Sequence, residues 1–495
     1  MNNQITTQGE NRGDITRDTH QPLKRFSRVL QQQGRVLLDA DWNEQTSILL
    51  RYLRTLAGDL IGEHGGPKTS FAVGVDPKDL GLTKQEVDDM KLNLGDFIIT
   101  KGHYYVAGIL CENENHLTYT TQPDNPGTAI PVGKANAPYL VYLDVWERHV
   151  NYLQDADANN PGIREVALGG IDTTTRAQVV WQVRTTEAKF KPSELADYQN
   201  FLGKIDALTY PGSGLLQARA KQPVTDGEVC PCVTSPEARY RGTENQLYRV
   251  EIHQAGVAWN NTVNKKTGEA AGNIATAATF KWSRENSSVD FAIRQPVDSG
   301  NGTTTVMLVQ LGRDARRNLE EGDWVEIVDD ISLLQPNPGT LLKVTLIERD
   351  EGKVTLQGMP AGNVGQDTTK HPLLRRWNHR SGQAKNGGLT LGADGAALVQ
   401  EGADDGGWLN LEKGVQIRFT TQKDGARYAP GDYWLIPARV ATGDVEWPGP
   451  ANDPAALPPH GIEHHYAPLA IINLDASGKI ASADNCRRTF DPLAK

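Results

Sequence analysis

The chain has 495 residues, with 51 Lys and Arg against 61 Asp and Glu, which gives a formal net charge of −10. This acidic balance argues against electrostatic capture of nucleic acid or of an anionic membrane surface. Only 38% of the residues are hydrophobic, and no run approaches the roughly 20 apolar residues of a membrane-spanning helix. At about 150 residues per domain, the length indicates about three domains. The 49 glycines and 27 prolines favour the many tight turns of a β-rich protein.

The N-terminal 66 residues are expected to form an arm, a short strand and one amphipathic helix. Residues 1–22 are polar and predict an extended arm, and the apolar run Arg35–Leu38 predicts a strand that leads into the helix. Asp41 with Glu44 three residues later has the form of a helix N-cap, and glycines from position 62 onward end the helix. Leucines recur at heptad spacing inside it, at Leu49, Leu53, Leu56 and Leu60.

The rest of the chain predicts short strands and two further helices, over 84–90 and 192–205. The strand segments are rich in Val, Ile, Tyr and Trp and are separated by Gly, Asn, Asp or Pro. They are Phe97–Thr100, Tyr104–Leu110, Tyr139–Trp146, Val179–Arg184, Leu247–His253, Phe280–Trp282, Val289–Ile293, Thr303–Leu311, Trp324–Val328, Leu341–Ile347, Lys353–Leu356, Gly414–Thr420, Tyr433–Ala438 and Leu469–Leu474. No regular strand–helix–strand alternation occurs, which disfavours a doubly wound α/β fold.

We therefore expect a mainly β protein with an N-terminal amphipathic helix, α+β overall, built from several small antiparallel sandwich or barrel-like modules. The expected parts are the arm, strand and helix over 1–66, a first β module with helical insertions over 67–215, central β modules over 216–357, a glycine-rich joint over 358–407 and a C-terminal β module over 408–495.

The segment His460-Gly-Ile-Glu463-His464-His465 is the strongest candidate for metal chemistry. Its letters match the H-x-x-E-H zinc-protease pattern, in which a helix places two imidazoles on one face and a carboxylate beside the metal-bound water. Prolines on both sides and an internal glycine disfavour such a helix and favour a loop leading into a strand. We expect no cofactor, and a structural metal ion or a metal-dependent hydrolase centred on this segment stays as the alternative.

Three other patterns are weaker. Cys230 and Cys232 are separated by one residue, whereas zinc ribbons use two. Asp155–Asn159 resembles the start of a calcium loop but lacks the glycine and the glutamate that complete one. Ten tryptophans could stack on sugar rings in a glycan-binding or cell-surface module, yet they are spread along the chain, which favours packing in a core or an interface.

Several blocks together resemble an uncharacterised domain family that recurs in gene clusters for phage-tail-like contractile injection systems. The blocks are Gly13–Asp18, Arg28–Glu44, Tyr142–Arg148, Arg164–Gly170, Asp172–Arg184, Tyr240–His253, Lys281–Asn286 and His460–Tyr466. The resemblance implies a structural part of a virion-like particle, as a baseplate-associated, fibre or cage-like subunit, and not an enzyme.

A particle subunit would act through its surfaces, so we expect it to bind other copies of itself, as a homo-oligomer, and other tail or baseplate proteins. Trp42, Leu49, Leu53 and Leu56 are the predicted interface residues, and the alternative is that they pack inside their own domain. The N-terminal sequence shows no secretion signal, so we expect synthesis and assembly in the cytoplasm, with release in extracellular particles left open.

Overall fold

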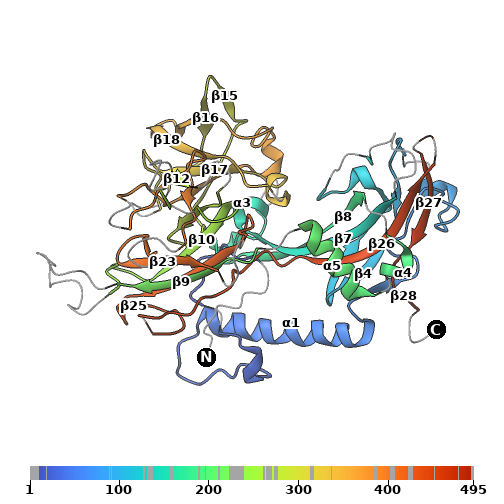
Figure 1. Cartoon of the computed structure of the whole chain (residues 1–495), viewed down its shortest axis with the longest axis horizontal. Coiled ribbons are helices and arrows are strands. Elements are labelled where there is room, and N and C mark those ends of the chain that lie inside the picture. The colour runs from blue at the N-terminus through green and yellow to red at the C-terminus, as the bar shows by residue number, and fades with distance from the viewer. Residues whose placement is uncertain are drawn as a thin grey trace, which may run out of the picture.

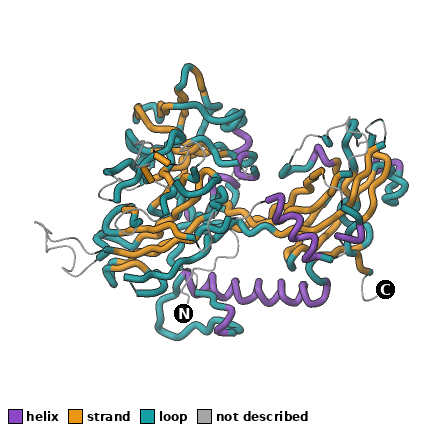
Figure 2. Tube along the Cα trace, viewed as in Figure 1, coloured by secondary structure: helices purple, strands orange, loops and turns teal. Residues whose placement is uncertain are grey.

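The structure is a computed structural model in which two β-rich lobes are joined by long strands and spanned on one side by helix α1 (Figure 1). It describes residues 10–17, 19–87, 90, 92–125, 129–130, 138–155, 161–187, 190–195, 197–209, 212–221, 239–259, 262–263, 270–271, 277–312, 317–335, 337–383, 387–401, 407–421, 427–450, 452–475, 477 and 479–491. Strands and loops make up most of both lobes, and α1 is the longest helix (Figure 2). The expected mainly β fold with an N-terminal helix is confirmed.

The first lobe combines three small sheets, ordered β28-β1-β4-β5, β2-β3-β6 and β27-β26-β7-β8, around one apolar core. Its strands are β1 (His64–Pro67), β2 (Val73–Gly74), β3 (Ile98–Ile99), β4 (Gly102–Val106), β5 (Ile109–Asn113), β6 (Leu117–Thr118), β7 (Tyr139–Val150), β8 (Arg176–Glu187), β26 (His465–Leu474), β27 (Ile480–Asn485) and β28 (Thr489–Phe490). Its short helices are α2 (Lys84–Val87), α4 (Pro192–Leu195) and α5 (Tyr198–Thr209), whereas α3 (Tyr152–Asp155), which follows β7, lies in the second lobe (Figure 1). The predicted helix over 192–205 is thus two helices, and residues 88–89 of the predicted helix over 84–90 lie outside the described residues.

The second lobe contains two sheets that share a core, β21-β13-β10-β24-β25 and β22-β23-β9, together with the small pair β11-β12. These strands are β9 (Leu215–Ala220), β10 (Gln246–Gln254), β11 (Thr262–Val263), β12 (Ala270–Ala271), β13 (Thr279–Ser283), β21 (Ala397–Leu398), β22 (Leu409–Asn410), β23 (Val415–Thr420), β24 (Tyr433–Arg439) and β25 (Asp444–Val445).

A seven-stranded antiparallel sheet, ordered β14-β20-β17-β18-β19-β16-β15, completes the second lobe around a core of its own. Its strands are β14 (Asp290–Ala292), β15 (Asp298–Gly300), β16 (Thr303–Met307), β17 (Trp324–Val328), β18 (Leu341–Glu348), β19 (Lys353–Gln357) and β20 (Leu373–Trp377). β20 and β21 lie within 358–407, so this stretch supplies strands to two sheets of the lobe rather than only a joint between modules.

The C-terminal strands return to the first lobe, which differs from the expected separate module over 408–495. β26 pairs antiparallel with β7, and β28 pairs parallel with β1. These pairings join segments more than 300 residues apart, which no local pattern can reveal. The return of the chain makes β7 and β26 the central connection between the two lobes (Figure 1).

Helix α1 (Asp39–Ile61) begins two residues before the predicted cap at Asp41. The residue before it, Leu38, is extended and makes no side-chain cap, while Asp39 Oδ2 accepts a hydrogen bond of 2.9 Å from the Thr16 backbone N–H. A contact with the arm therefore fixes this end. The expected glycine exit is confirmed: Gly62 has φ +94° and its N–H donates to the carbonyl of Gly58 at 2.8 Å.

The predicted strand over Arg35–Leu38 is wrong. These residues form an exposed loop that leads into α1, because no strand in the described part of the chain pairs with them. A single strand without a neighbour leaves its backbone groups to water and gains no sheet hydrogen bonds.

Candidate functional site

Exposed apolar side chains are concentrated at the N-terminus of the protein. Of the 25 large hydrophobic side chains that are exposed in the described residues, 13 lie between positions 23 and 60. They are Leu23, Phe26, Leu30, Val36, Leu37, Leu38, Trp42, Leu49, Leu50, Tyr52, Leu53, Leu56 and Leu60. We call this set the arm–helix surface. Single exposed apolar residues are ordinary, whereas large exposed apolar patches are typical of interaction surfaces.

The four predicted interface residues all belong to the arm–helix surface. Their exposed fractions are 76% for Trp42, 52% for Leu49, 57% for Leu53 and 42% for Leu56. They therefore do not pack in the core of their own domain. With Thr46 and Leu60 they form a stripe with alternating spacings of four and three residues, which is the a/d pattern of a helix that packs against a second helix.

Only a few contacts hold α1 to the rest of the chain. Ala40 and Ile48 are its only buried residues among those described, and Arg54 Nη2 lies 2.8 Å from Glu147 Oε1 on β7. Gly108, in the turn between β4 and β5, lets the helix backbone approach closely, because a Cβ there would lie 2.5 Å from the Arg54 carbonyl oxygen. The helix thus lies across the lobes without covering a core.

A groove of about 970 Å³ lies between the C-terminal half of α1 and the first lobe. The helix side of it is apolar, with Leu53, Ala57 and Leu60, and the strand side adds apolar residues such as Leu110 and Trp181. Four carboxylates also line it: Glu112, Glu114, Asp124 and Glu147. We call it the α1 groove. It combines an apolar floor with a negative charge.

The His460–His465 segment does not form the helix that zinc-protease chemistry requires, and the expected loop leading into a strand is confirmed. His460 exchanges two backbone hydrogen bonds with Tyr433, at 2.7 and 2.8 Å, and burial lowers its pKa to about 4. Residues 461–464 have no regular secondary structure, and His465 begins β26. The His464 ring stacks on the Tyr466 ring at 6.1 Å, whereas His465 is the strand neighbour of Tyr466 and points to the other side, so the two histidines do not face one site.

Each side chain of the segment has its own surroundings instead. His464 Nδ1 lies 2.6 Å from Asp144 Oδ1, and its ring packs 4.7 Å from the Trp146 ring. Glu463 is exposed, and its Oε1 lies 3.9 Å from His465 Nε2. Within the described residues, no group of three or more His, Cys, Asp or Glu side chains could hold a metal ion. Cys230, Cys232 and residues 156–160 of the calcium-like pattern lie outside those residues.

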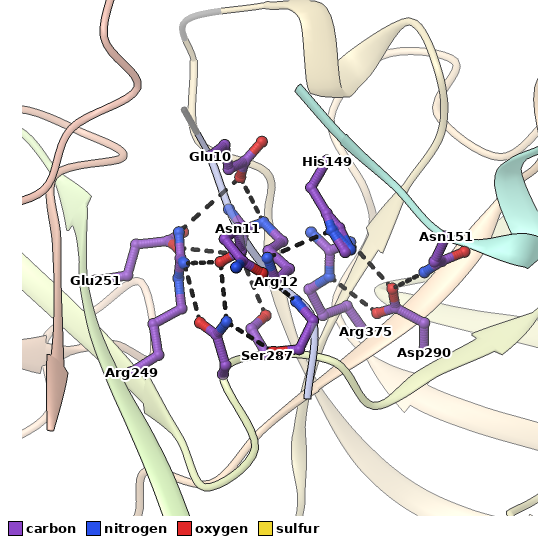
Figure 3. Close-up of polar contacts among 12 residues, drawn as sticks. Glu10, Asn11, Arg12, His149, Asn151, Arg249, Glu251, Ser287, Asp290 and Arg375 are labelled. Atoms are coloured by element: carbon purple, nitrogen blue, oxygen red, sulfur yellow. Dashed lines mark hydrogen bonds and ion pairs between the residues drawn. The ribbon is translucent and has the colours of Figure 1, made fainter. Parts of the chain in front are cut away.

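The junction between the lobes holds a buried network of charged residues that the sequence did not predict (Figure 3). Arg249 and Glu251 lie two positions apart on β10, so both point to the same side of the strand, and Arg249 is 0% exposed. Arg249 Nε is 2.6 Å from Glu251 Oε2, and its guanidinium lies 3.5 Å from the centre of the Tyr433 ring. Lys281 Nζ lies 2.7 Å from Glu326 Oε2. Burial works to raise the pKa of Glu326, but Lys281 and His253 together lower it to about 2.

This network clamps the N-terminal arm. Arg12 Nη1 is 3.0 Å from Glu251 Oε2, and Arg12 Nε is 2.5 Å from Glu10 Oε1. Arg249 Nη1 donates to the Asn11 carbonyl at 2.9 Å, and Asn286 Nδ2 donates to the same carbonyl at 3.0 Å. The arm segment over 10–16 is thereby fixed between the lobes, and it delivers the chain to the exposed loop and α1. The only feature of the sequence that could have indicated this network is the pair of opposite charges two positions apart, Arg249 and Glu251. The same pattern is typical of a strand that faces solvent, so it does not predict burial.

Residues 11–214 and 208–494 match the Family of unknown function (DUF6519). The chain belongs to this family. The family description assigns no activity, so membership confirms the uncharacterised family and leaves the function to the geometry. No curated protein and no solved structure matches the chain.

The tryptophans of this DUF6519 chain are mostly covered. Trp42 is the only tryptophan that is exposed, and six of the ten are buried, as expected for packing residues. An array of exposed rings for sugar stacking is thus absent from the described chain. None of its helices there has the length and apolar character needed to cross a membrane.

Proposed function

We propose that this DUF6519 chain is a structural subunit of a multiprotein particle and acts by binding, not by catalysis. The particle is of the phage-tail-like contractile type that the sequence resemblance implies. The observation that carries the proposal is the arm–helix surface, with 13 exposed apolar side chains between positions 23 and 60. Larger contiguous apolar patches on soluble proteins are typical of protein–protein contacts.

The energetics of α1 support a binding role. A helix in water gains most of its stability from packing one apolar face against the rest of the protein. Of the 23 residues of α1, the structure buries only Ala40 and Ile48, while the leucines of its heptad stripe are 42–73% exposed. A partner that covers the stripe would supply the missing packing.

Substitution of Leu49, Leu53 and Leu56 by glutamine tests the proposal. Glutamine keeps a high helix propensity, so the helix itself should persist. Complete burial of a leucine stabilises by about 1.5–3 kcal/mol, and each of these side chains is about half exposed, so burying the rest of all three adds roughly 3 kcal/mol. Their loss should weaken the binding about 100-fold.

The assay is co-sedimentation of the chain with particles purified from the cells that produce it, followed by quantitative mass spectrometry. We expect the wild-type chain in the particle fraction and the triple variant in the soluble fraction. The matched control changes Val309, Leu346 and Met359 to glutamine, since these are similarly exposed residues of the second lobe, away from α1. A wild-type chain that is absent from every particle fraction, or a triple variant that sediments as the wild type does, would refute the proposal.

A further inference from the structure

The loop before α1 carries an unusual combination of charge and apolar residues. Residues 22–38, which we call the arm loop, contain Lys24, Arg25, Arg28 and Arg35 and no acidic residue, in a chain of net charge −10. Every residue of the arm loop except Pro22 and Val29 is exposed. Six of the side chains of the arm–helix surface lie in it, from Leu23 to Leu38. The arm loop is therefore cationic, apolar and uncovered.

The α1 groove has the complementary chemistry. Its apolar floor suits the leucine, valine and phenylalanine side chains of the arm loop, and the carboxylates of Glu112, Glu114 and Asp124 suit the arginines. Its one basic lining residue is Arg54, which is already paired with Glu147 at 2.8 Å. Glu112 is 59% exposed, and Glu114 is exposed too, so both can meet an incoming cation at the edge of the groove. Opposite charges at such an edge steer association and fix its orientation.

The arm loop of the same chain lies at the wrong end of the helix to fill the groove. It joins α1 at Leu38 and is held near that end by a hydrogen bond of 2.8 Å from the Val29 N–H to Gln45 Oε1. The groove begins around Leu50 and extends to Ile61. At 1.5 Å per residue, roughly 25 Å of helix separates Leu38 from the middle of the groove. Figure 1 shows the loop beside the N-terminal end of α1.

We infer that the arm loop of one copy docks in the α1 groove of a second copy of this chain. The inference rests on the proposed role as a particle subunit and names its partner as the chain itself. The contact joins two different surfaces, so it is head-to-tail. Repeated contacts of this type form a closed ring or a helical stack, depending on the rotation between neighbours. Each copy uses both its loop and its groove once.

Two charge-reversed variants test the inference in solution. The first, Arg25→Glu with Arg28→Glu and Arg35→Glu, changes the net charge of the arm loop from +4 to −2. The second, Glu112→Lys with Glu114→Lys, makes the groove basic. All five residues are exposed, so the melting temperatures should stay within a few degrees of the wild type. Light scattering after size exclusion, over a range of protein concentrations at low salt, gives the mass of each species.

We expect the wild-type chain to self-associate, more weakly at high salt, and each variant alone to associate at least tenfold more weakly. Mixing the two variants should restore association, because the acidic loop of one fits the basic groove of the other and the opposite pair stays intact. A photoreactive residue in place of Phe26 should cross-link to residues 50–61 or 105–112 of a second copy.

Three outcomes would overturn the inference: a wild-type chain that stays monomeric, variants that associate as the wild type does, or cross-links that map elsewhere. None of these decides the particle role, which the co-sedimentation assay tests separately. A chain that enters particles but does not bind itself would refute the loop–groove contact and leave the proposed function standing.

Discussion

Replacing Glu251 by glutamine removes the carboxylate on which three cations converge at the lobe junction. Glu251 Oε2 lies 2.6 Å from Arg249 Nε and 3.0 Å from Arg12 Nη1, and Oε1 lies 3.4 Å from Lys281 Nζ. These cations hold the pKa of Glu251 well below its usual value, although burial works to raise it. The charged carboxylate is therefore a central part of the clamp on the arm.

The three cations differ in the carboxylate partners that remain to them after the substitution. After the substitution Lys281 keeps Glu326 at 2.7 Å, and Arg12 keeps Glu10 at 2.5 Å. For Arg249, which is fully buried, Glu10 at 3.9 Å is the closest carboxylate left among the described ion pairs. Leaving a buried charge without its partner costs about 3–5 kcal/mol. We expect Glu251→Gln to destabilise the protein by that amount.

The opposite substitution, Arg249→Met, should cost less. Glu251 would keep Arg12 and Lys281, so no buried charge is orphaned. The loss is then mainly the hydrogen bonds to the Asn11 carbonyl and to Asn286 Oδ1, at 2.9 and 3.2 Å, worth about 1–3 kcal/mol together.

Urea unfolding gives the free energy of unfolding for each variant, and limited trypsin digestion reports release of the arm as faster cleavage after Arg12. The control is Lys68→Gln, because Lys68 and its partner Asp491 are 66% and 54% exposed, and this surface pair should contribute less than about 1 kcal/mol. The reasoning fails if Glu251→Gln stays within 1 kcal/mol of the wild type, or if Arg249→Met is the more destabilising change.

Two further predictions concern the first lobe and the pH. Gly108→Ala should displace α1 and speed hydrogen exchange around Arg54, because its Cβ would lie 2.5 Å from the Arg54 carbonyl oxygen. The control is Gly81→Ala, where the glycine also has a positive φ but a Cβ would meet no atom within 4 Å. Hydrogen exchange in α1 should be unchanged in this control variant. Burial lowers the pKa of both His64 and His149 to about 4. The unfolded chain therefore binds these protons near pH 6.5 and the folded chain does not, so the free energy of unfolding should fall as the pH drops from 6.5 to 4. A flat urea-unfolding profile over that range would contradict the assignment.

Local patterns predicted most elements because strand and helix periodicity is local. The strand over Trp324–Val328 has the predicted bounds in β17, and the helix after residue 38 forms as its leucine spacing indicates. The same local reasoning failed at Arg35–Leu38, where the β-type composition has no neighbouring strand. Composition describes a residue's preference, whereas a strand also requires a partner.

For the candidate sites, too, the sequence showed local features but not their surroundings in the fold. The heptad stripe with Leu49 and Leu53 was visible in the sequence, but its exposure was not, since an amphipathic helix usually covers its own core. The letters around His464 matched a metal motif, yet pairing with Asp144, 320 residues away, makes it a structural contact. The sequence did not predict the clamp on the arm, because the alternating charges of Arg249 and Glu251 are typical of a surface strand. Only the fold brings Arg12 next to them.

The sequence by itself determined most of the elements and the apolar stripe of α1, because each depends on composition or on neighbours within a few positions. Only the tertiary structure decided which segments pair, that α1 spans two lobes with its stripe half exposed, and that the charges at the junction are buried. Burial and pairing depend on contacts between residues hundreds of positions apart, and the surfaces proposed to bind are what those contacts leave uncovered.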